Sequence, residues 1–203
     1  MPRRNRVTPT GEIVAHPARG MFMGNRGILH DDAGRLTGLP WRHKAWICCA
    51  LDFRGRRRAL MQPGRYTELF FLDEAVALAA GHRPCAECRR AAFDRFRAAW
   101  ARAGLGEATA PAMDRLLHSG RVRPRTGGQV THAARAEDLP DGSFVVLAGG
   151  SALVLGSALR PWRPEGYDAP LPRPSGPVTV LTPAPAVAVL RAGYGPALHP
   201  SAR

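Results

Sequence analysis

The chain has 203 residues, a net charge of +13 and 45% hydrophobic residues, enough to bury a sizeable core as one domain or two small ones. No apolar run approaches the roughly 18 residues of a membrane span, and four cysteines are too few for a disulfide framework in a chain of this length. These features argue against a membrane protein and against a small disulfide-rich secreted domain. No apolar segment follows the basic N-terminus, so we expect no secretory signal and a reducing, cytoplasmic location.

The positive charge is unevenly distributed along the chain. Residues 1–65 carry 13 basic and 4 acidic groups, residues 66–135 carry 11 and 7, and residues 136–203 carry 5 of each. This asymmetry predicts a polyanionic partner for the first two-thirds, most often nucleic acid. We therefore divide the chain into a flexible basic arm (1–20), a metal- and nucleic-acid-binding part (21–135) and a neutral α+β part (136–203) that packs on it.

The first predicted elements are short strands. Residues 27–30 and 35–36 flank an Asp/Gly turn, and His30 at a strand end is a candidate metal ligand or catalytic base, or a solvated turn residue. Residues 46–53 (WICCALDF) are the clearest strand, and a turn over 54–58 leads to a return strand over 59–61.

The tip of this predicted hairpin carries a cluster of arginines. Four like charges repel one another, so such a tip is tolerated best when phosphates neutralise it, although a solvated loop explains it equally well. The four residues are Arg54, Arg56, Arg57 and Arg58.

Two adjacent cysteines lie in the predicted strand. Successive side chains of a strand face opposite sides, so a regular strand cannot aim Cys48 and Cys49 at one metal ion. Cys49 shares its face with the more apolar residues and is the firmer candidate ligand. Cys48 joins only if the strand bulges, and otherwise His43 or His30 supplies the fourth ligand.

A short helix over residues 73–80, capped by Asp73 and ended by Gly81, precedes the second pair of cysteines. Cys85 and Cys88 form a Cys-x-x-Cys turn that opens the next helix, which is the spacing of half a tetrahedral zinc site. A thioredoxin-like redox pair follows a strand in an α/β unit, which is not the context here. A pair of inert thiols is the other alternative.

The run from Phe70 to Cys88, which contains Ala-Gly-His-Arg-Pro-Cys-Ala-Glu-Cys, resembles a known module. It is similar to the second half of the zinc-binding N-terminal domain of the bacterial alkylation-response regulator Ada, over about residues 68–90. The resemblance implies a four-cysteine zinc site made of Cys48, Cys49, Cys85 and Cys88, and it implies DNA as the nucleic acid. Two departures are that the first two cysteines are adjacent here and that His82 replaces an aromatic residue.

Helical periodicity predicts two further helices and a small C-terminal sheet. Residues 86–103 bury Phe93, Phe96 and Trp100, and residues 110–118 place Asp114 and His118 one turn apart as a candidate acid–base pair or an ordinary surface pair. We expect strands over 144–148, 152–155 and 178–181 and a helix from Pro183 to about 191. The fold class is therefore α+β, a small zinc-stapled hairpin and helix module followed by short antiparallel strands.

These observations predict a DNA-binding protein with a structural zinc ion, in repair or regulation. One alternative is an enzyme acting on DNA, such as a repair glycosylase or a nuclease, that uses Asp114, His118 or His30 for proton transfer. A second is a zinc thiolate that accepts a methyl group. A third is a zinc-stapled protein-interaction module. The predicted phosphate contacts are Arg54, Arg56, Arg57, Arg58, Arg65, Arg83, Arg89 and Arg90.

Overall fold

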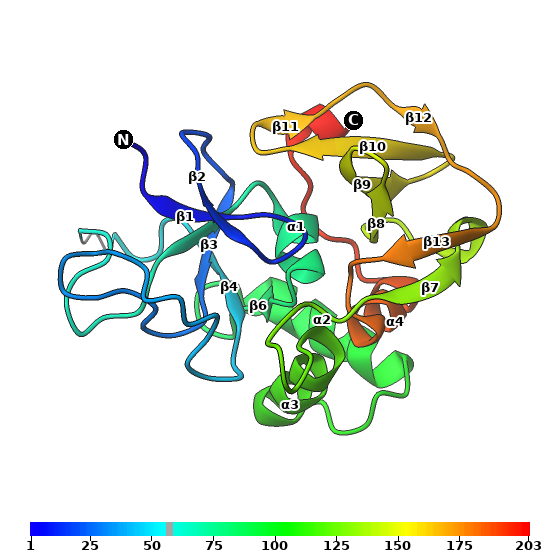
Figure 1. The fold of residues 1–203 in the computed structure, drawn as a ribbon. Helices are drawn as coiled ribbons and strands as arrows, with labels where there is room; N and C mark the ends of the chain where they lie inside the picture. The colour runs from blue at the N-terminus through cyan, green and yellow to red at the C-terminus, as the bar shows by residue number, and fades with distance from the viewer. Residues whose placement is uncertain (56–58) are drawn as a thin grey trace.

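Two β-sheets stand on either side of one short helix in the computed structural model, which describes residues 1–55 and 59–203 (Figure 1). The first sheet has the order β2-β1-β5-β3-β4-β6, with β1–β5 and β4–β6 parallel and the other pairs antiparallel. Its strands are β1 (Arg4–Val7), β2 (Ile13–Ala15), β3 (Phe22–Asn25), β4 (Ile47–Ala50), β5 (Leu69–Phe71) and β6 (Arg83–Pro84).

The second sheet lies in the C-terminal third and is antiparallel throughout. Its order is β11-β10-β9-β8-β13-β7, and β12 also pairs with β10. The expected hairpin is confirmed as β8 and β9, and the expected strand over 178–181 as β13. The strands are β7 (His132–Arg135), β8 (Phe144–Leu147), β9 (Gly150–Leu155), β10 (Ala158–Arg163), β11 (Gly166–Tyr167), β12 (Leu171–Pro172) and β13 (Pro177–Val180).

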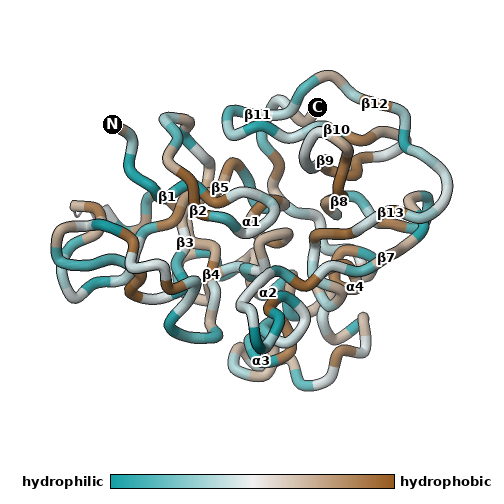
Figure 2. The backbone as a smooth tube through the Cα atoms, viewed as in Figure 1, coloured by the Kyte–Doolittle hydropathy of each residue, from teal (hydrophilic) through white to brown (hydrophobic). Residues whose placement is uncertain are grey.

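The helix α1 (Glu74–Ala79) lies between the sheets, and all six of its residues are buried. It begins where expected, because the Asp73 carboxylate accepts a hydrogen bond from the Val76 N–H, and the left-handed Gly81 (φ +84°) follows its end. One hydrophobic cluster joins Leu69 and Phe71 of β5 to Phe144 and Leu153 of the second sheet through this helix. Figure 2 shows apolar segments in β5 and in β8, on the two sides of α1. The C-terminal third therefore shares a core with the rest.

Three longer helices form a second layer beneath α1, namely α2 (Arg90–Arg102), α3 (Ala110–Arg121) and α4 (Ala184–Arg191). The predicted apolar face of α2 is confirmed, because Phe93, Phe96 and Trp100 are buried against α3 and α4. Two short 3₁₀ turns, at Ala136–Asp138 and Pro200–Ala202, complete the elements.

The N-terminal segment differs from the flexible arm expected for residues 1–20. Residues 4–7 and 13–15 form β1 and β2, and β1 pairs in parallel with β5 through Arg6 and Phe70. Asn5 and Val7 are buried, and the Arg6 guanidinium stacks on the Phe70 ring at 4.9 Å. The sequence lacks periodicity here because the strands are too short to show it.

The predicted central hairpin also differs from the structure. The strand is only four residues long, and its neighbours are β3 and β6 rather than a return strand over 59–61, which is a turn. The expected strands at 27–30 and 35–36 reduce to one bridge between His30 and Leu36. Arg56, Arg57 and Arg58 lie outside the described residues.

Two buried carboxylates at the start of α1 fasten the C-terminal segment to the first sheet. The Asp73 Oδ2 accepts hydrogen bonds from the Tyr167 hydroxyl (2.8 Å) and the His199 N–H (3.1 Å). The Glu74 carboxylate accepts from the Tyr194 hydroxyl (2.5 Å) and the Ala197 N–H (2.9 Å). Burial raises the pKa of Asp73, and these hydrogen bonds act in the opposite direction.

We expect Tyr167→Phe to lower the free energy of unfolding by about 1–3 kcal/mol, because Asp73 loses a hydrogen bond in a buried site while the ring is kept. Urea denaturation followed by circular dichroism measures the change. An unchanged midpoint would show that this hydrogen bond does not fasten the two halves of the fold.

Candidate metal centre

The strand β4 presents its two adjacent cysteines to opposite sides of the first sheet. Met23 of β3 is paired with Cys49, and Gly24 is paired with Cys48. At Gly24 a Cβ atom would lie 2.1 Å from the Ile47 carbonyl oxygen and 2.9 Å from the Phe71 ring, so only glycine lets β3 and β4 approach this closely. The pairing therefore fixes which cysteine faces which side.

The turn after β6 carries the other two cysteines to the same edge. β6 runs parallel to β4, and the Cys85 N–H donates to the Cys48 carbonyl at 2.9 Å. The neighbouring thiols of Cys49 and Cys88 lower the pKa of Cys85, and the backbone N–H groups of Cys88 and Glu87 act in the same direction. Backbone donors aimed at sulfur stabilise thiolates, which are the form that binds metal.

Three sulfur atoms meet at this edge. The Sγ atoms of Cys49, Cys85 and Cys88 lie within 4.8 Å of one another. Thiolates on one tetrahedral ion, at metal–sulfur distances of about 2.3 Å, are about 3.8 Å apart, so a small inward movement lets all three bind the same ion. These three residues can therefore hold a metal ion.

The three clustered thiols influence one another's pKa values. The nearby thiols of Cys49 and Cys88 lower the pKa of Cys85, whereas the thiols of Cys85 and Cys88, followed by burial, raise the pKa of Cys49. The charge state of each thiol therefore depends on its neighbours in the cluster.

Cys48 lies apart from this cluster, on the other side of the sheet. Its Sγ accepts a hydrogen bond from Arg89 Nη1 at 3.3 Å, and burial raises its pKa. The strand does not bulge at Cys48, so its side chain stays on the opposite face, as strand alternation predicts. The four-cysteine set that the resemblance implies is thus brought together only in part.

Neither candidate histidine joins the three thiols. His30 is buried, its Nδ1 lies 2.6 Å from the Thr67 hydroxyl, and its Nε2 lies 3.2 Å from the Gln62 carbonyl oxygen. His43 is exposed. Over residues 1–55 and 59–203, no fourth cysteine, histidine or acidic side chain belongs to the cluster.

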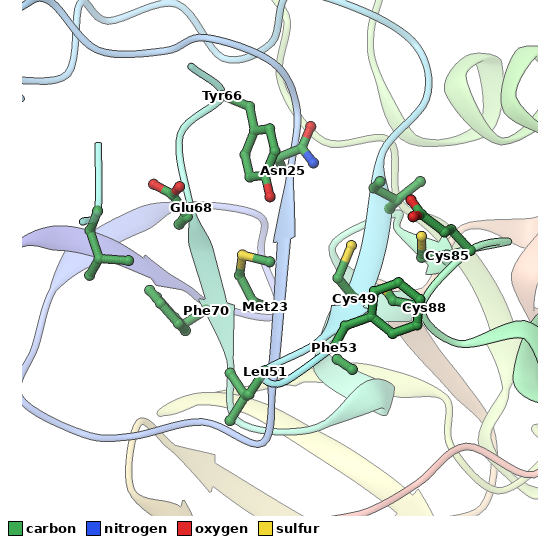
Figure 3. Close-up of a pocket in the computed structure, with 14 residues that line it drawn as sticks. Met23, Asn25, Cys49, Leu51, Phe53, Tyr66, Glu68, Phe70, Cys85 and Cys88 are labelled. Carbon is green, nitrogen blue, oxygen red and sulfur yellow. The ribbon is translucent and has the colours of Figure 1, made fainter. Parts of the chain in front are cut away.

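A pocket of about 850 Å³ opens beside the cluster, and all three cysteines line it (Figure 3). Its apolar wall includes Met23, Leu51 and Phe70, and Tyr66, Glu68 and Glu87 add polar groups. Figure 3 shows Cys49 between Met23 on one side and Cys85 and Cys88 on the other. The three sulfurs are therefore beside a space large enough for a small molecule or a nucleotide-sized group.

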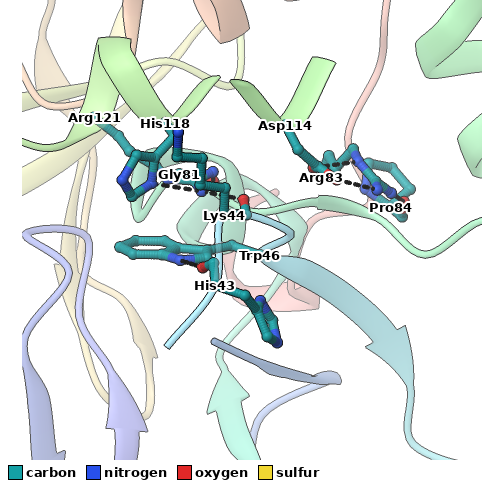
Figure 4. Close-up of polar contacts among 9 residues, drawn as sticks. All are labelled: His43, Lys44, Trp46, Gly81, Arg83, Pro84, Asp114, His118 and Arg121. Carbon is teal, nitrogen blue, oxygen red and sulfur yellow. Dashed lines mark hydrogen bonds and ion pairs between the residues drawn. The ribbon is translucent and has the colours of Figure 1, made fainter. Parts of the chain in front are cut away.

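Two of the predicted phosphate contacts are instead structural groups whose side chains are 9% exposed or less. The Arg83 guanidinium makes a two-pronged ion pair with Asp114, with both N–O distances at 2.8 Å, which ties α3 to β6 (Figure 4). The Arg89 guanidinium bridges the Glu74 carboxylate (2.8 Å) and Cys48. Arg54, Arg65 and Arg90 are exposed as expected.

The candidate acid–base pair on α3 is also separated. Asp114 is occupied by Arg83, and His118 Nδ1 lies 3.2 Å from Arg121 Nη2 while its ring packs edge-on against Trp41. Burial lowers the pKa of His118, followed by the effect of the Arg121 charge. The two residues share a helix but serve different neighbours.

The sequence analysis missed two further groups of residues. Tyr167 and Tyr194 hold the start of α1 from more than 90 residues away, as given above, and no local signal marks such pairs. The buried arginines Arg26 and Arg121 stack on Trp46, with the guanidinium carbons 4.2 Å and 4.0 Å from the ring centroid. Arginine side chains are usually exposed, so nothing in the sequence indicates that these two are buried against a tryptophan.

Comparisons with models of protein families, with curated proteins and with solved structures gave no match. Among the described residues, no helix has the length and apolar character needed to cross a membrane.

We expect one metal ion per chain in the purified protein, lost in Cys49→Ser, Cys85→Ser or Cys88→Ser and retained in Cys48→Ser. The serine hydroxyl is a poor replacement for a thiolate, and Cys48 points away from the other three sulfurs. Native mass spectrometry with elemental analysis measures the ion. Equal loss in Cys48→Ser would show that β4 rearranges to bring both thiols to the metal.

Proposed function

We propose that the protein is a zinc protein that acts on nucleic acid, with DNA favoured, and that its three-cysteine centre is reactive. The supporting observation is that Cys49, Cys85 and Cys88 lie together on the wall of the pocket. Structural zinc sites have four protein ligands, whereas reactive sites keep one position for water or substrate. This proposal replaces the structural zinc ion expected from four cysteines.

Zinc is the ion that this set of ligands suits best. Soft thiolates select zinc, copper(I) and iron–sulfur clusters rather than magnesium or calcium. The Cys-x-x-Cys turn at the start of α2, with a third cysteine from a neighbouring strand, is a common way to build a tetrahedral site. When bound, zinc would keep these thiols deprotonated and nucleophilic near neutral pH.

The chemistry that we propose is transfer of an alkyl group from DNA to one of the three thiolates. In this step the sulfur attacks a methyl carbon of a phosphotriester. The new S–C bond forms as the C–O bond breaks, and the phosphodiester leaves with the electron pair, so no other reactant is needed. Cys88 is the most exposed of the three cysteines, and the resemblance to the Ada module supports the same chemistry.

Hydrolysis is the second candidate, and two carboxylates in the same pocket favour it. Glu68 and Glu87 line the pocket with the three cysteines, so a metal-activated water would have a proton acceptor nearby. The two chemistries differ in their stoichiometry, because a thiolate that has accepted an alkyl group is consumed whereas a hydrolase turns over.

Nucleic acid is supported by the charge of the chain and by the position of its exposed arginines. The net charge is +13. Arg54 stacks on Phe53 of the pocket wall at 5.0 Å, Arg65 precedes the pocket residue Tyr66, and Arg90 follows Cys88 by two residues. A phosphate backbone held by these arginines would pass over the mouth of the pocket.

To test the reaction, zinc-loaded protein is incubated with duplex DNA that carries a radiolabelled methyl phosphotriester. We expect at most one labelled methyl group per chain, on a peptide containing Cys49, Cys85 or Cys88, because the acceptor is not regenerated. Cys48→Ser is the matched control and should accept the label as the wild type does.

The other outcomes separate the alternatives. Repeated turnover, slowed by Glu68→Gln or Glu87→Gln, would identify a hydrolase in place of the alkyl acceptor. If the protein stays unlabelled and the DNA is unchanged, the zinc centre has a structural role and the proposal is wrong.

We expect the combined replacement of Arg54, Arg65 and Arg90 by alanine to weaken DNA binding similarly on all sequences. If each guanidinium contacts one phosphate, the slope of log affinity against log salt should flatten by about 2.7. Fluorescence anisotropy over a range of salt concentrations measures it. A matched triple variant of exposed arginines from the C-terminal third, Arg163, Arg191 and Arg203, should leave the slope nearly unchanged, and equal slopes for wild type and the first variant would contradict the proposed path.

A further inference from the structure

A second pocket, of about 350 Å³, lies away from the cysteines, between the β1–β2 turn and the loop after α3. Its lining includes Gly11 and Glu12 of the turn, Gly127 of the loop, and the guanidinium-bearing residues Arg26 and Arg121 with Trp46. The volume is on the order of ten waters, at about 30 Å³ each. The pocket therefore has room for a small polyatomic ion.

The pocket is built around two buried positive charges. The exposed fractions of Arg26 and Arg121 are 3% and 2%, and their guanidinium groups share the Trp46 ring as their neighbour. Figure 4 shows the Arg121 guanidinium beside this ring. Burial lowers the pKa of each to about 9, and for Arg121 the charge of Arg26 adds to this shift while that of Asp114, which is paired with Arg83, opposes it. Two like charges are thus held in a desolvated place, which is costly unless an anion balances them.

The contacts of these two arginines are with neutral groups. Arg26 donates from Nε to His82 Nε2 (3.3 Å) and from Nη1 to the Gly11 carbonyl (3.0 Å). Arg121 donates to the carbonyl oxygens of Gly81 and Lys44, each at 2.5 Å, and its Nη2 also lies 3.2 Å from His118 Nδ1. Burial and the neighbouring arginines lower the pKa of His82, so this ring is neutral and adds no charge.

Two other arginines with largely covered side chains provide the comparison. Arg83 has Asp114 and Arg89 has Glu74, each within 2.8 Å. Within the described part of the chain, Arg26 and Arg121 have no such ion pair, and the buried Arg26 Nη2 and Arg121 Nε have no hydrogen-bond partner. A Cβ placed on Gly11 would lie 3.8 Å from Arg26 Nη2, so this donor lies beside the turn that lines the pocket.

We propose that this pocket, lined by Arg26, Arg121 and Trp46, is a binding site for a phosphate group. Guanidinium donors in a partly desolvated site match the oxygens of phosphate in charge and geometry, and they exclude cations. The one acidic residue of the lining, Glu12, is exposed at the end of the β1–β2 turn. The site does not depend on the metal centre or on its proposed chemistry.

The proposal is tested by isothermal titration of the full chain with inorganic phosphate against chloride at equal ionic strength. We expect one phosphate per chain with a Kd of about 1 mM or tighter. Arg26→Gln should weaken binding by about tenfold or more, since a charge-assisted donor is lost. Arg163→Gln, at an exposed and remote arginine, is the matched control and should bind as the wild type does.

A variant that keeps the core intact makes the test independent of folding defects. Glu12→Gln removes a negative charge at the pocket without touching a buried group, so phosphate should bind up to about fivefold more tightly. Absence of saturable binding to the wild type would overturn the proposal, as would unchanged affinity in both Arg26→Gln and Glu12→Gln.

A second arm identifies the source of the phosphate group. Competition by a thymidine dinucleotide would assign the site to a nucleic-acid phosphodiester. Binding of phosphate without this competition would assign it to a free phosphate or a phosphate monoester.

Discussion

The fold depends on the buried start of α1, where two adjacent carboxylates receive hydrogen bonds from residues far along the chain. Asp73 holds Tyr167 and the backbone at His199, and Glu74 holds Tyr194 and the backbone at Ala197. Carboxylates at a helix start are favoured by the helix dipole, but their burial is tolerated only because every oxygen has a donor. The interaction that joins the two sheets therefore also requires the C-terminal segment to be in place.

The side chain of Arg89 links the buried start of α1 to the strand that carries Cys49 of the candidate metal centre. Arg89 follows Cys88 in the sequence and connects the Glu74 carboxylate to the Cys48 sulfur. The adjacent cysteines of β4 thus have separate roles, because Cys49 faces the pocket with Cys85 and Cys88 while Cys48 belongs to the packing around α1. A protein held together only by a metal would not need this second set of contacts.

Local patterns in the sequence were sufficient for the parts of the fold that local forces determine. Capping rules predict Asp73 at the start of α1, and helical periodicity predicts the apolar face of α2. Strand alternation predicts that Cys49 points to the opposite side of the sheet from Cys48. Strands of three or four residues carry too little pattern, so β1 and β2 were mistaken for a flexible arm. Buried arginines such as Arg83 and Arg121 were mistaken for surface charge, because their burial depends on partners supplied by distant segments. The pocket likewise arises only when three strands and a turn are assembled.

The adjacency of Cys48 and Cys49 has a consequence for how the first sheet selects its register. A slip of β4 by one residue would reverse its faces and exchange the two thiols. A sulfur atom would still face Cys85 and Cys88, so a metal ion cannot distinguish the slipped pairing from the native one. Neighbours that lack a duplicate do distinguish the two pairings. In the native one Gly24 receives the close approach of the Ile47 carbonyl, and Trp46 lies against Arg26 and Arg121, and a slip would change both contacts. The two thiols therefore do not by themselves specify the register of β4, and residues such as Gly24 and Trp46 contribute to it.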